Sequence, residues 1–212
     1  TACDACPAGT YTAVKGSTAC ALCAAGGYCE EVGADSAAVF DPCPAGTWSD
    51  VVGLNSSRGC HACAEGKYLP TTGATSADQC LACPLGTASA APGTSACPSC
   101  TPGTYQPSEG ATACETCPVA SYCPMAGLSA PTPCPGGTWS DATGLYSADQ
   151  CIPVVAGEYA SIGSQFPETC PASGFTCPGA ANDHVNQVPG SKPIAIESGH
   201  STTTTNTTTT TT

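Results

Sequence analysis

Residues 43–63 read CPAGTWSDVVGLNSSRGCHAC and contain the pattern that decides the fold: a cysteine, a Pro-x-Gly turn, an aromatic residue and a closing C-x2-C pair. Residues 134–151 read CPGGTWSDATGLYSADQC, so Trp48 and Trp139 lie in nearly identical surroundings. Proline sets φ and glycine permits a tight turn directly after the cysteine, so the ring can lie against a disulfide and cover it. The pattern predicts a small disulfide-stapled module, and its recurrence indicates duplication of a block of modules.

The same elements recur along most of the chain. The turn appears as PAGTY at 7–11, AEGKY at 64–68 and TPGTY at 101–105, while PLGTA at 84–88 keeps the turn and loses the ring. The C-x2-C pairs are Cys3/Cys6, Cys20/Cys23, Cys60/Cys63, Cys80/Cys83, Cys97/Cys100 and Cys114/Cys117. Self-similarity of this kind is the signature of a linear array. The predicted fold class is therefore small and disulfide-rich: an elongated tandem array of cysteine-rich modules with short β-hairpins and almost no helix.

The composition indicates a fold that is stabilised by disulfides rather than by a large apolar core. The 212 residues include 19 Cys, 24 Gly and 20 Pro, and only 6% are aromatic. Many small modules, each stapled by its own bridges, need no extensive apolar core. Disulfides persist in oxidising surroundings, which predicts a secreted, extracellular or cell-surface protein.

Charge and hydropathy exclude two classes of partner. The formal net charge is −12, so phosphate backbones would be repelled and nucleic-acid binding is not expected. The chain contains no run of 18 apolar residues, so no membrane span is expected within it.

Spacing alone does not fix disulfide connectivity. A nearest-neighbour scheme accounts for nearly every cysteine, with the pairs Cys6–Cys20, Cys23–Cys29, Cys43–Cys60, Cys63–Cys80, Cys83–Cys97, Cys100–Cys114, Cys117–Cys123, Cys134–Cys151 and Cys170–Cys177. An interleaved scheme, with Cys3–Cys20 and Cys6–Cys23, is the alternative. The cysteine count is odd, and the nearest-neighbour scheme leaves Cys3 free, bonded to another chain or paired with sequence outside this chain.

The motifs resemble the ephrin-receptor-like cysteine-rich repeat, which is related in shape to tumour necrosis factor receptor repeats. The clearest matches are CDACPAGTY from Cys3, CPAGTW from Cys43, CPSCTPGTY from Cys97 and CPGGTW from Cys134. The resemblance covers about residues 3–178 and implies an elongated extracellular stalk, of a type common in surface proteins of protists and algae. It implies no catalytic residues. Ala88 departs from the pattern at the aromatic position, as do the loops between Cys29 and Cys43 and between Cys123 and Cys134.

Beyond the predicted array at 1–178, the residue composition changes. Residues 179–201 are expected to form a cysteine-free extended linker in which Pro193–Glu197 could run as an edge strand. Residues 202–212 are a Thr-rich tail, for which dense O-glycosylation is predicted at Thr202, Thr203, Thr204, Thr205, Thr207, Thr208, Thr209, Thr210, Thr211 and Thr212. Asn55 and Asn206 begin N-glycosylation sequons. Apart from covalent glycans, no cofactor is expected.

Metal binding, thiol–disulfide exchange and catalysis are the alternatives to a structural role for these residues. Cys60/Cys63 with Cys80/Cys83 has the separation of a zinc ribbon, but the overlapping repetition of the pattern favours disulfides. Neither thiol–disulfide exchange nor catalysis is expected: no helix start is predicted beside a C-x2-C pair, and His61, His184 and His200 are scattered. Asp50 and Asp141 could bind calcium, although capping of a turn is the favoured role. No metal site is predicted.

Two functions fit these features. The first is a structural glycoprotein, the subunit of an extracellular fibril, appendage or coat, which self-associates or joins another extracellular glycoprotein. Its expected contact is β-augmentation through 188–197, reinforced by Cys3. The alternative is a receptor or adhesion ectodomain stalk that binds a protein or glycan. The unpaired cysteine and the Thr tail favour the structural role. Neither function is enzymatic.

Overall fold

The computed structural model describes residues 5–15, 17–171, 175–177, 179 and 194–195. Several predicted features therefore lie outside the described residues: Cys3, His184, His200, Asn206, the Thr-rich tail and most of 188–197. The described part divides into two compact units, Thr1–Thr132 with Ala142–Gln150, and Pro133–Asp141 with Cys151–Thr212. Each unit is described by itself.

Within the described residues there is no α-helix, and all regular structure is short. Turns separate strands of two residues each: β1 Thr10–Tyr11, β2 Ala21–Leu22, β3 Gly27–Tyr28, β4 Asp41–Pro42, β5 Thr47–Trp48, β6 His61–Ala62, β7 Lys67–Tyr68, β8 Leu81–Ala82, β9 Thr104–Tyr105, β10 Glu115–Thr116, β11 Ser121–Tyr122, β12 Thr132–Pro133, β13 Thr138–Trp139, β14 Ile152–Pro153, β15 Glu158–Tyr159, β16 Glu168–Thr169, β17 Phe175–Thr176 and β18 Ile194–Ala195. The 3-10 helices are η1 Ala37–Val39, η2 Ser57–Gly59, η3 Ala77–Gln79 and η4 Ala148–Gln150. The predicted fold of small disulfide-rich tandem modules with short hairpins is confirmed.

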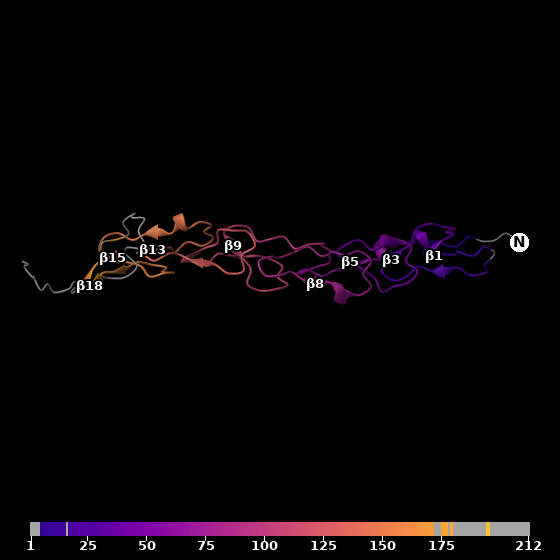
Figure 1. The fold of residues 1–212 in the computed structure, drawn as a ribbon, viewed down its shortest axis with the longest axis horizontal. Helices are drawn as coiled ribbons and strands as arrows, with labels where there is room; N and C mark the ends of the chain where they lie inside the picture. The colour runs from indigo at the N-terminus through magenta and orange to yellow at the C-terminus, as the bar shows by residue number, and fades with distance from the viewer. Residues whose placement is uncertain (1–4, 16, 172–174, 178, 180–193, 196–212) are drawn as a thin grey trace, which may run out of the picture. The chain divides into compact units, whose positions relative to one another are not determined.

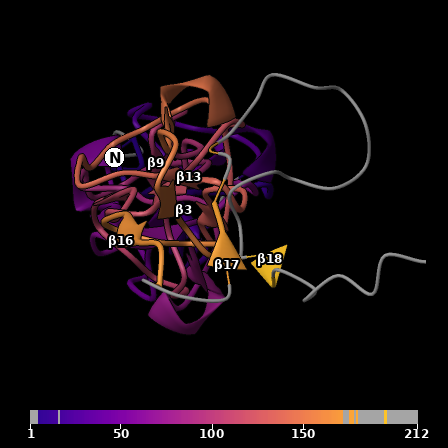
Figure 2. The same ribbon diagram turned by 90° about the vertical axis from the view of Figure 1, so that its left-hand side faces the viewer.

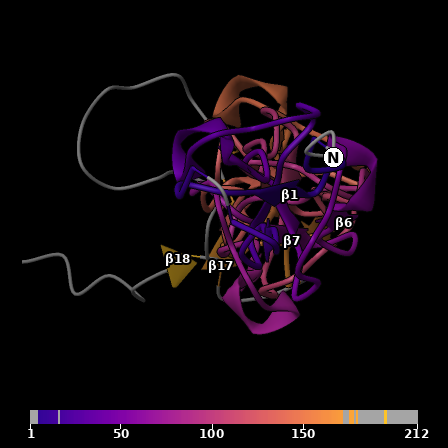
Figure 3. The same cartoon turned by 90° about the vertical axis from the view of Figure 1, so that its right-hand side faces the viewer.

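Most modules contain a two-stranded antiparallel hairpin built on the motif, whereas the module that opens at Cys83 has only an isolated antiparallel bridge between Thr87 and Ser99. The strand that carries the aromatic residue pairs with the two residues inside the closing C-x2-C, as Trp48 pairs with His61 and Thr47 with Ala62. In the first unit the hairpins follow one another in sequence order from β1 to β9 (Figure 1). β1, β6 and β7, which Figure 3 labels in the end-on view, belong to three separate two-stranded sheets.

Nine disulfides staple the described array, and they join the same pairs as the nearest-neighbour scheme rather than the interleaved one. Cystine sulfur takes the place of a conventional core: half-cystines make up most of the side chains that are less than 2% exposed. Such a core is small because a module contributes at most one crosslink and one aromatic ring to it. The modules therefore gain most of their order from covalent loop closure.

The repeats are named below by their opening residue, which directly precedes the turn: the Cys6, Cys23, Cys43, Cys63, Cys83, Cys100, Cys117, Cys134, Val154 and Cys170 repeats. In three of them the opening cysteine forms a short loop within its own turn, to Cys29, Cys123 and Cys177. Phe40 and Pro131 then stand directly before β4 and β12, where the other repeats place a closing cysteine.

The strand predicted near the C-terminus is present at β18. Ile194 and Ala195 pair with Thr176 and Phe175 of β17, so these two residues form a hairpin within their own chain (Figure 2). Neighbouring positions of the proposed contact at 188–197 lie outside the described residues.

Candidate functional site

The repeats are joined to their neighbours through the backbone, and this junction is the most regular feature of the molecule. Between the Cys63 and Cys83 repeats, the Gly66 N–H donates to the Ser89 carbonyl at 2.9 Å and the Leu69 N–H donates to the Thr94 carbonyl at 3.1 Å. In the opposite direction, the Gly93 N–H donates to the Cys63 carbonyl at 2.8 Å. Each junction of this form thus has three backbone hydrogen bonds, two running forward and one back.

The same positions are used at other junctions. Within the first unit the backward bond recurs from the second glycine of one repeat to the opening cysteine of the previous repeat, as Gly53 to Cys23, Gly73 to Cys43, Gly110 to Cys83, Gly127 to Cys100 and Gly144 to Cys117. Within the second unit, Gly163 donates to Cys134 in the same way at 2.9 Å. Buried peptide groups at the ends of short hairpins would otherwise lack partners, and such groups are costly to leave unpaired. The modules are therefore hydrogen-bonded repeats rather than independent beads.

Repeats that are two apart also approach closely in the first unit. The Gly103 backbone lies in the left-handed region at φ +86°, and a Cβ built there would lie 2.7 Å from the Gly144 carbonyl oxygen. The equivalent pairs are Gly9/Gly53, Gly26/Gly73, Gly46/Gly93, Gly66/Gly110 and Gly86/Gly127. A side chain would clash with backbone at these places, so the glycines serve both the turn and the contact with the second-next repeat.

The Trp48 ring covers a disulfide, but not that of its own repeat. Trp48 packs against a buried cluster of Cys63, Leu69, Ala74 and Cys80, so it covers the crosslink of the following repeat. Its backbone forms a parallel bridge with Ala74, and its ring centroid lies 5.1 Å from that of His61. Covering of a disulfide by the ring was predicted from the motif. Which disulfide it covers depends on the stacking of repeats, which the motif does not encode.

Trp139 repeats this arrangement with a change of chemistry. It forms a parallel bridge with Ser164, and its ring centroid lies 6.3 Å from that of Phe166. The repeat it contacts has Val154 and Pro167 at the positions of the two cysteines. Sequence reasoning missed this repeat because the search followed cysteines, although VAGEY at 155–159 preserves the outline of PAGTY.

The isolated site residues predicted from sequence are distributed over the surface. Asn55 and Ser57 of the first sequon are exposed, as are His61, Asp50 and Asp141. The favoured capping role of Asp50 is wrong: Ser49, which is fully buried, accepts a hydrogen bond from the Val51 N–H at 3.2 Å. In the described part of the chain no group of His, Cys, Asp and Glu could hold a metal ion.

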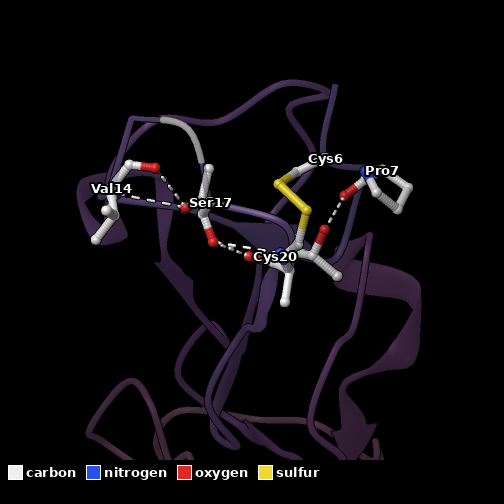
Figure 4. The surroundings of a disulfide bond; sticks show 8 residues. Cys6, Pro7, Val14, Ser17 and Cys20 are labelled. Carbon is white, nitrogen blue, oxygen red and sulfur yellow. Dashed lines mark hydrogen bonds between the residues drawn. A yellow bond between two sulfur atoms is a disulfide. The ribbon is translucent and has the colours of Figure 1, made fainter. Parts of the chain in front are cut away.

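A cavity of about 500 Å³ lies beside the Cys6–Cys20 disulfide, and residues that line it include Thr12, Val14, Ser17 and Ala19. Figure 4 shows Ser17 between Val14 and this disulfide, and the Ser17 hydroxyl donates to the Ala19 carbonyl at 2.7 Å. Thr12 and Ser17 correspond to positions whose carbonyls accept the forward junction bonds in the following repeats. The cavity therefore belongs to the repeat junction rather than to a separate ligand site.

Two tyrosines pair with glutamates across a hairpin. The Tyr159 hydroxyl donates to the Glu168 carboxylate, and this hydrogen bond raises the pKa of Tyr159 above its usual value, with smaller contributions from desolvation and from the glutamate charge. Glu115 raises the pKa of Tyr105 by the same causes in the same order. A raised folded pKa means that the neutral phenol is the favoured form, so any stability from the pair is present below pH 10 and is lost as pH rises through the folded pKa.

We expect Glu168→Gln to bring the pKa of Tyr159 back towards its ordinary value, because the amide lacks the charge and accepts a weaker hydrogen bond. Ultraviolet titration of tyrosinate absorbance would measure the shift as an earlier onset of ionisation. The matched control is Glu158→Gln, which changes the residue next to Tyr159 in β15. This variant should leave the titration curve unchanged. Identical curves for Glu168→Gln and the unaltered chain would contradict the assignment.

The model of the family described as tyrosine-protein kinase ephrin type A/B receptor-like matches residues 1–38 and 86–129. The resemblance drawn from the motifs is thereby confirmed for these two stretches. No curated protein matches the chain. No helix in its described part has the length and apolarity needed to cross a bilayer.

The class of protein follows from these findings. The chain is a disulfide-rich tandem-repeat protein, and residues 1–38 and 86–129 are similar to an ephrin-receptor-like family. Its crosslinks and this family together indicate an extracellular or cell-surface location.

Proposed function

We propose that this chain is a structural glycoprotein, the subunit of an extracellular fibril, appendage or coat, without a catalytic role. The single observation that carries the proposal is the repeated junction, in which backbone hydrogen bonds, and in the first unit glycine contacts as well, tie neighbouring repeats together within each unit. Such coupling transmits load along a chain, because a repeat cannot swing about its linker without breaking three hydrogen bonds.

The composition of the surface is consistent with this role. Charged residues make up 9% of the chain, and the described elements present no cluster of functional side chains in a cavity of their own. Bound sugar would keep such a surface soluble, and the sequon at Asn55 offers an exposed acceptor. Self-association or attachment to another extracellular glycoprotein would complete the assembly, with Cys3 as a candidate for an interchain bond.

A receptor or adhesion stalk is the second candidate, and the family match favours it specifically, because the matching family is described by a receptor kinase. The two proposals predict different assembly states for the purified chain in the absence of a ligand. A structural subunit forms polymers, whereas a stalk remains monomeric until its ligand is added. Negative-stain electron microscopy and light scattering of the chain, expressed with oxidative folding and glycosylation, separate them. Filaments or sheets are expected; dispersed monomers at every concentration tested would overturn the structural proposal.

Glycosylation is tested at a position that does not disturb the fold. We expect Ser57→Ala to lower the intact mass by one N-glycan, because the hydroxyl of the sequon is lost. Ser57→Thr is the matched control and should retain the glycan, since threonine serves equally in the sequon. Asn55 and Ser57 are exposed, so neither change removes packing. Masses of the two variants that differ from the unaltered chain only by the substituted side chains would show that Asn55 carries no sugar.

A further inference from the structure

The Val154 repeat keeps the geometry of its neighbours while lacking their crosslink. Tyr159 pairs with Glu168, just as Trp139 pairs with Ile152 in the preceding repeat. Pro167 directly precedes β16 as Cys151 directly precedes β14, and Val154 stands four residues before β15 as Cys134 does before β13. Val154 and Pro167 therefore occupy the two half-cystine positions.

Contacts at Val154 support this equivalence. Its N–H donates to the Gly137 carbonyl at 3.0 Å, as the Cys63 N–H donates to Gly46 at 2.9 Å. Val154 is 4% exposed, the same fraction as Cys151. The valine side chain thus fills the site of the missing sulfur, and the hairpin persists without a covalent bond.

Noncovalent contacts alone hold this repeat in place. The junction bonds run from Gly137 to Ala160 at 2.8 Å and from Gly163 to Cys134 at 2.9 Å, and the Tyr159–Glu168 side-chain hydrogen bond joins the two strands of the hairpin. The hydrophobic side chains around it are poorly covered: Val155 is 63% exposed, Ile162 70% and Phe166 58%. Little apolar burial therefore replaces the disulfide.

Residues 152–169 form the longest stretch without a half-cystine between Cys6 and Cys177. Closing a loop of this size with a disulfide disfavours the open state on the order of a hundredfold in the chain-entropy model. A repeat that lacks this constraint opens more often than one that has it, provided that its other contacts are similar.

We propose that the Val154 repeat is the extensible link of the array, which opens locally before any disulfide-closed repeat. When the ends of the chain are pulled, a disulfide-closed loop cannot lengthen beyond its crosslink. Residues 152–169 can be drawn out in full, to about 60 Å at the reach of an extended backbone. The array can thereby lengthen and refold while every disulfide stays intact. Residues 30–42 and 124–133 also lie outside a disulfide loop, but both segments are shorter than 152–169. The same opening makes this stretch the first to be reached by a protease.

Hydrogen exchange followed by mass spectrometry tests the proposal on the oxidised chain. Amides of β15 and β16 are expected to exchange on the order of a hundredfold faster than those of β13 and β14 in the Cys134 repeat. The double variant V154C/P167C should form a tenth disulfide, seen as a loss of two hydrogens with no additional thiol available for alkylation. It should slow exchange in β15 and β16 to the rate of the Cys134 repeat.

The variant V154S/P167S is the matched control, because serine resembles cysteine in size and cannot form a bridge. It should exchange at least as fast as the unaltered chain. Equal exchange in the two repeats of the unaltered chain would overturn the proposal, as would a bridged V154C/P167C with unchanged exchange. Failure of the two cysteines to bond would contradict the equivalence of positions on which the proposal depends. None of these outcomes depends on whether the chain assembles into a polymer.

Discussion

Reduction of the disulfides without added denaturant is expected to unfold the array. Half-cystines are the main buried side chains, and the largest apolar cluster in the described part of the chain gathers around the single crosslink Cys63–Cys80. Each native crosslink in a small module contributes about 3 kcal/mol, whereas a whole domain is stable by only about 5–15 kcal/mol. Loss of all nine bridges in the described residues therefore exceeds the available stability about two- to fivefold.

Circular dichroism and tryptophan fluorescence during titration with a phosphine reductant measure this effect. Trp48 covers the Cys63–Cys80 bridge, so its emission should shift to longer wavelength as that bridge is reduced. The variant Trp139→Phe assigns the signal to Trp48. An alkylated sample that has lost all its disulfides and still shows the oxidised spectra would contradict a crosslink-dependent fold.

Gly103→Ala is expected to destabilise the contact between its repeat and the repeat two positions further on. At φ +86° an L-residue is strained by about 1 kcal/mol, and the new methyl group would meet the Gly144 carbonyl, which adds about 2 kcal/mol of overpacking. The midpoint of denaturant unfolding under non-reducing conditions should fall accordingly. Exchange of the Gly144 amide, which donates to Cys117, should accelerate with it.

Gly157→Ala separates the backbone strain from the clash with a neighbouring carbonyl. Gly157 has a similar φ of +91°, but a Cβ built there meets nothing within 4 Å. Only the backbone strain applies, so the expected loss is about 1 kcal/mol. If both variants lose the same stability, the close approach of Gly103 to Gly144 does not contribute to the free energy of unfolding. The inference that repeats two apart are coupled would then be wrong.

Much of the module could be predicted from the sequence because its determinants are local. The turn after Cys43, the strand at Trp48 and the pairing with residues inside the next C-x2-C all follow from a few adjacent residues. The disulfide between Cys43 and Cys60 is local in the same sense, because the hairpin brings the two cysteines together.

Features that depend on stacking could not be predicted in this way. Nothing in the motif says that Trp48 covers the bridge of the following repeat, or that Gly103 meets Gly144, because both contacts join residues far apart in sequence. The cap at Ser49 was assigned to Asp50 because carboxylates commonly cap turns, whereas burial selects the smaller neutral side chain here. The Val154 repeat was hidden by its lack of cysteine, although its burial and register are those of its neighbours.

Amide hydrogen exchange at the junction glycines tests the central claim most directly. The N–H groups of Gly93 and Gly110 donate to Cys63 and Cys83 of the preceding repeats, and no bond within their own repeat replaces these contacts. Nuclear magnetic resonance of the oxidised chain should find both amides protected together, with exchange slowed by orders of magnitude relative to an unstructured peptide. Exchange of Gly93 and Gly110 at the unstructured rate, while all the disulfides remain intact, would show that the repeats are independent beads and would contradict the account.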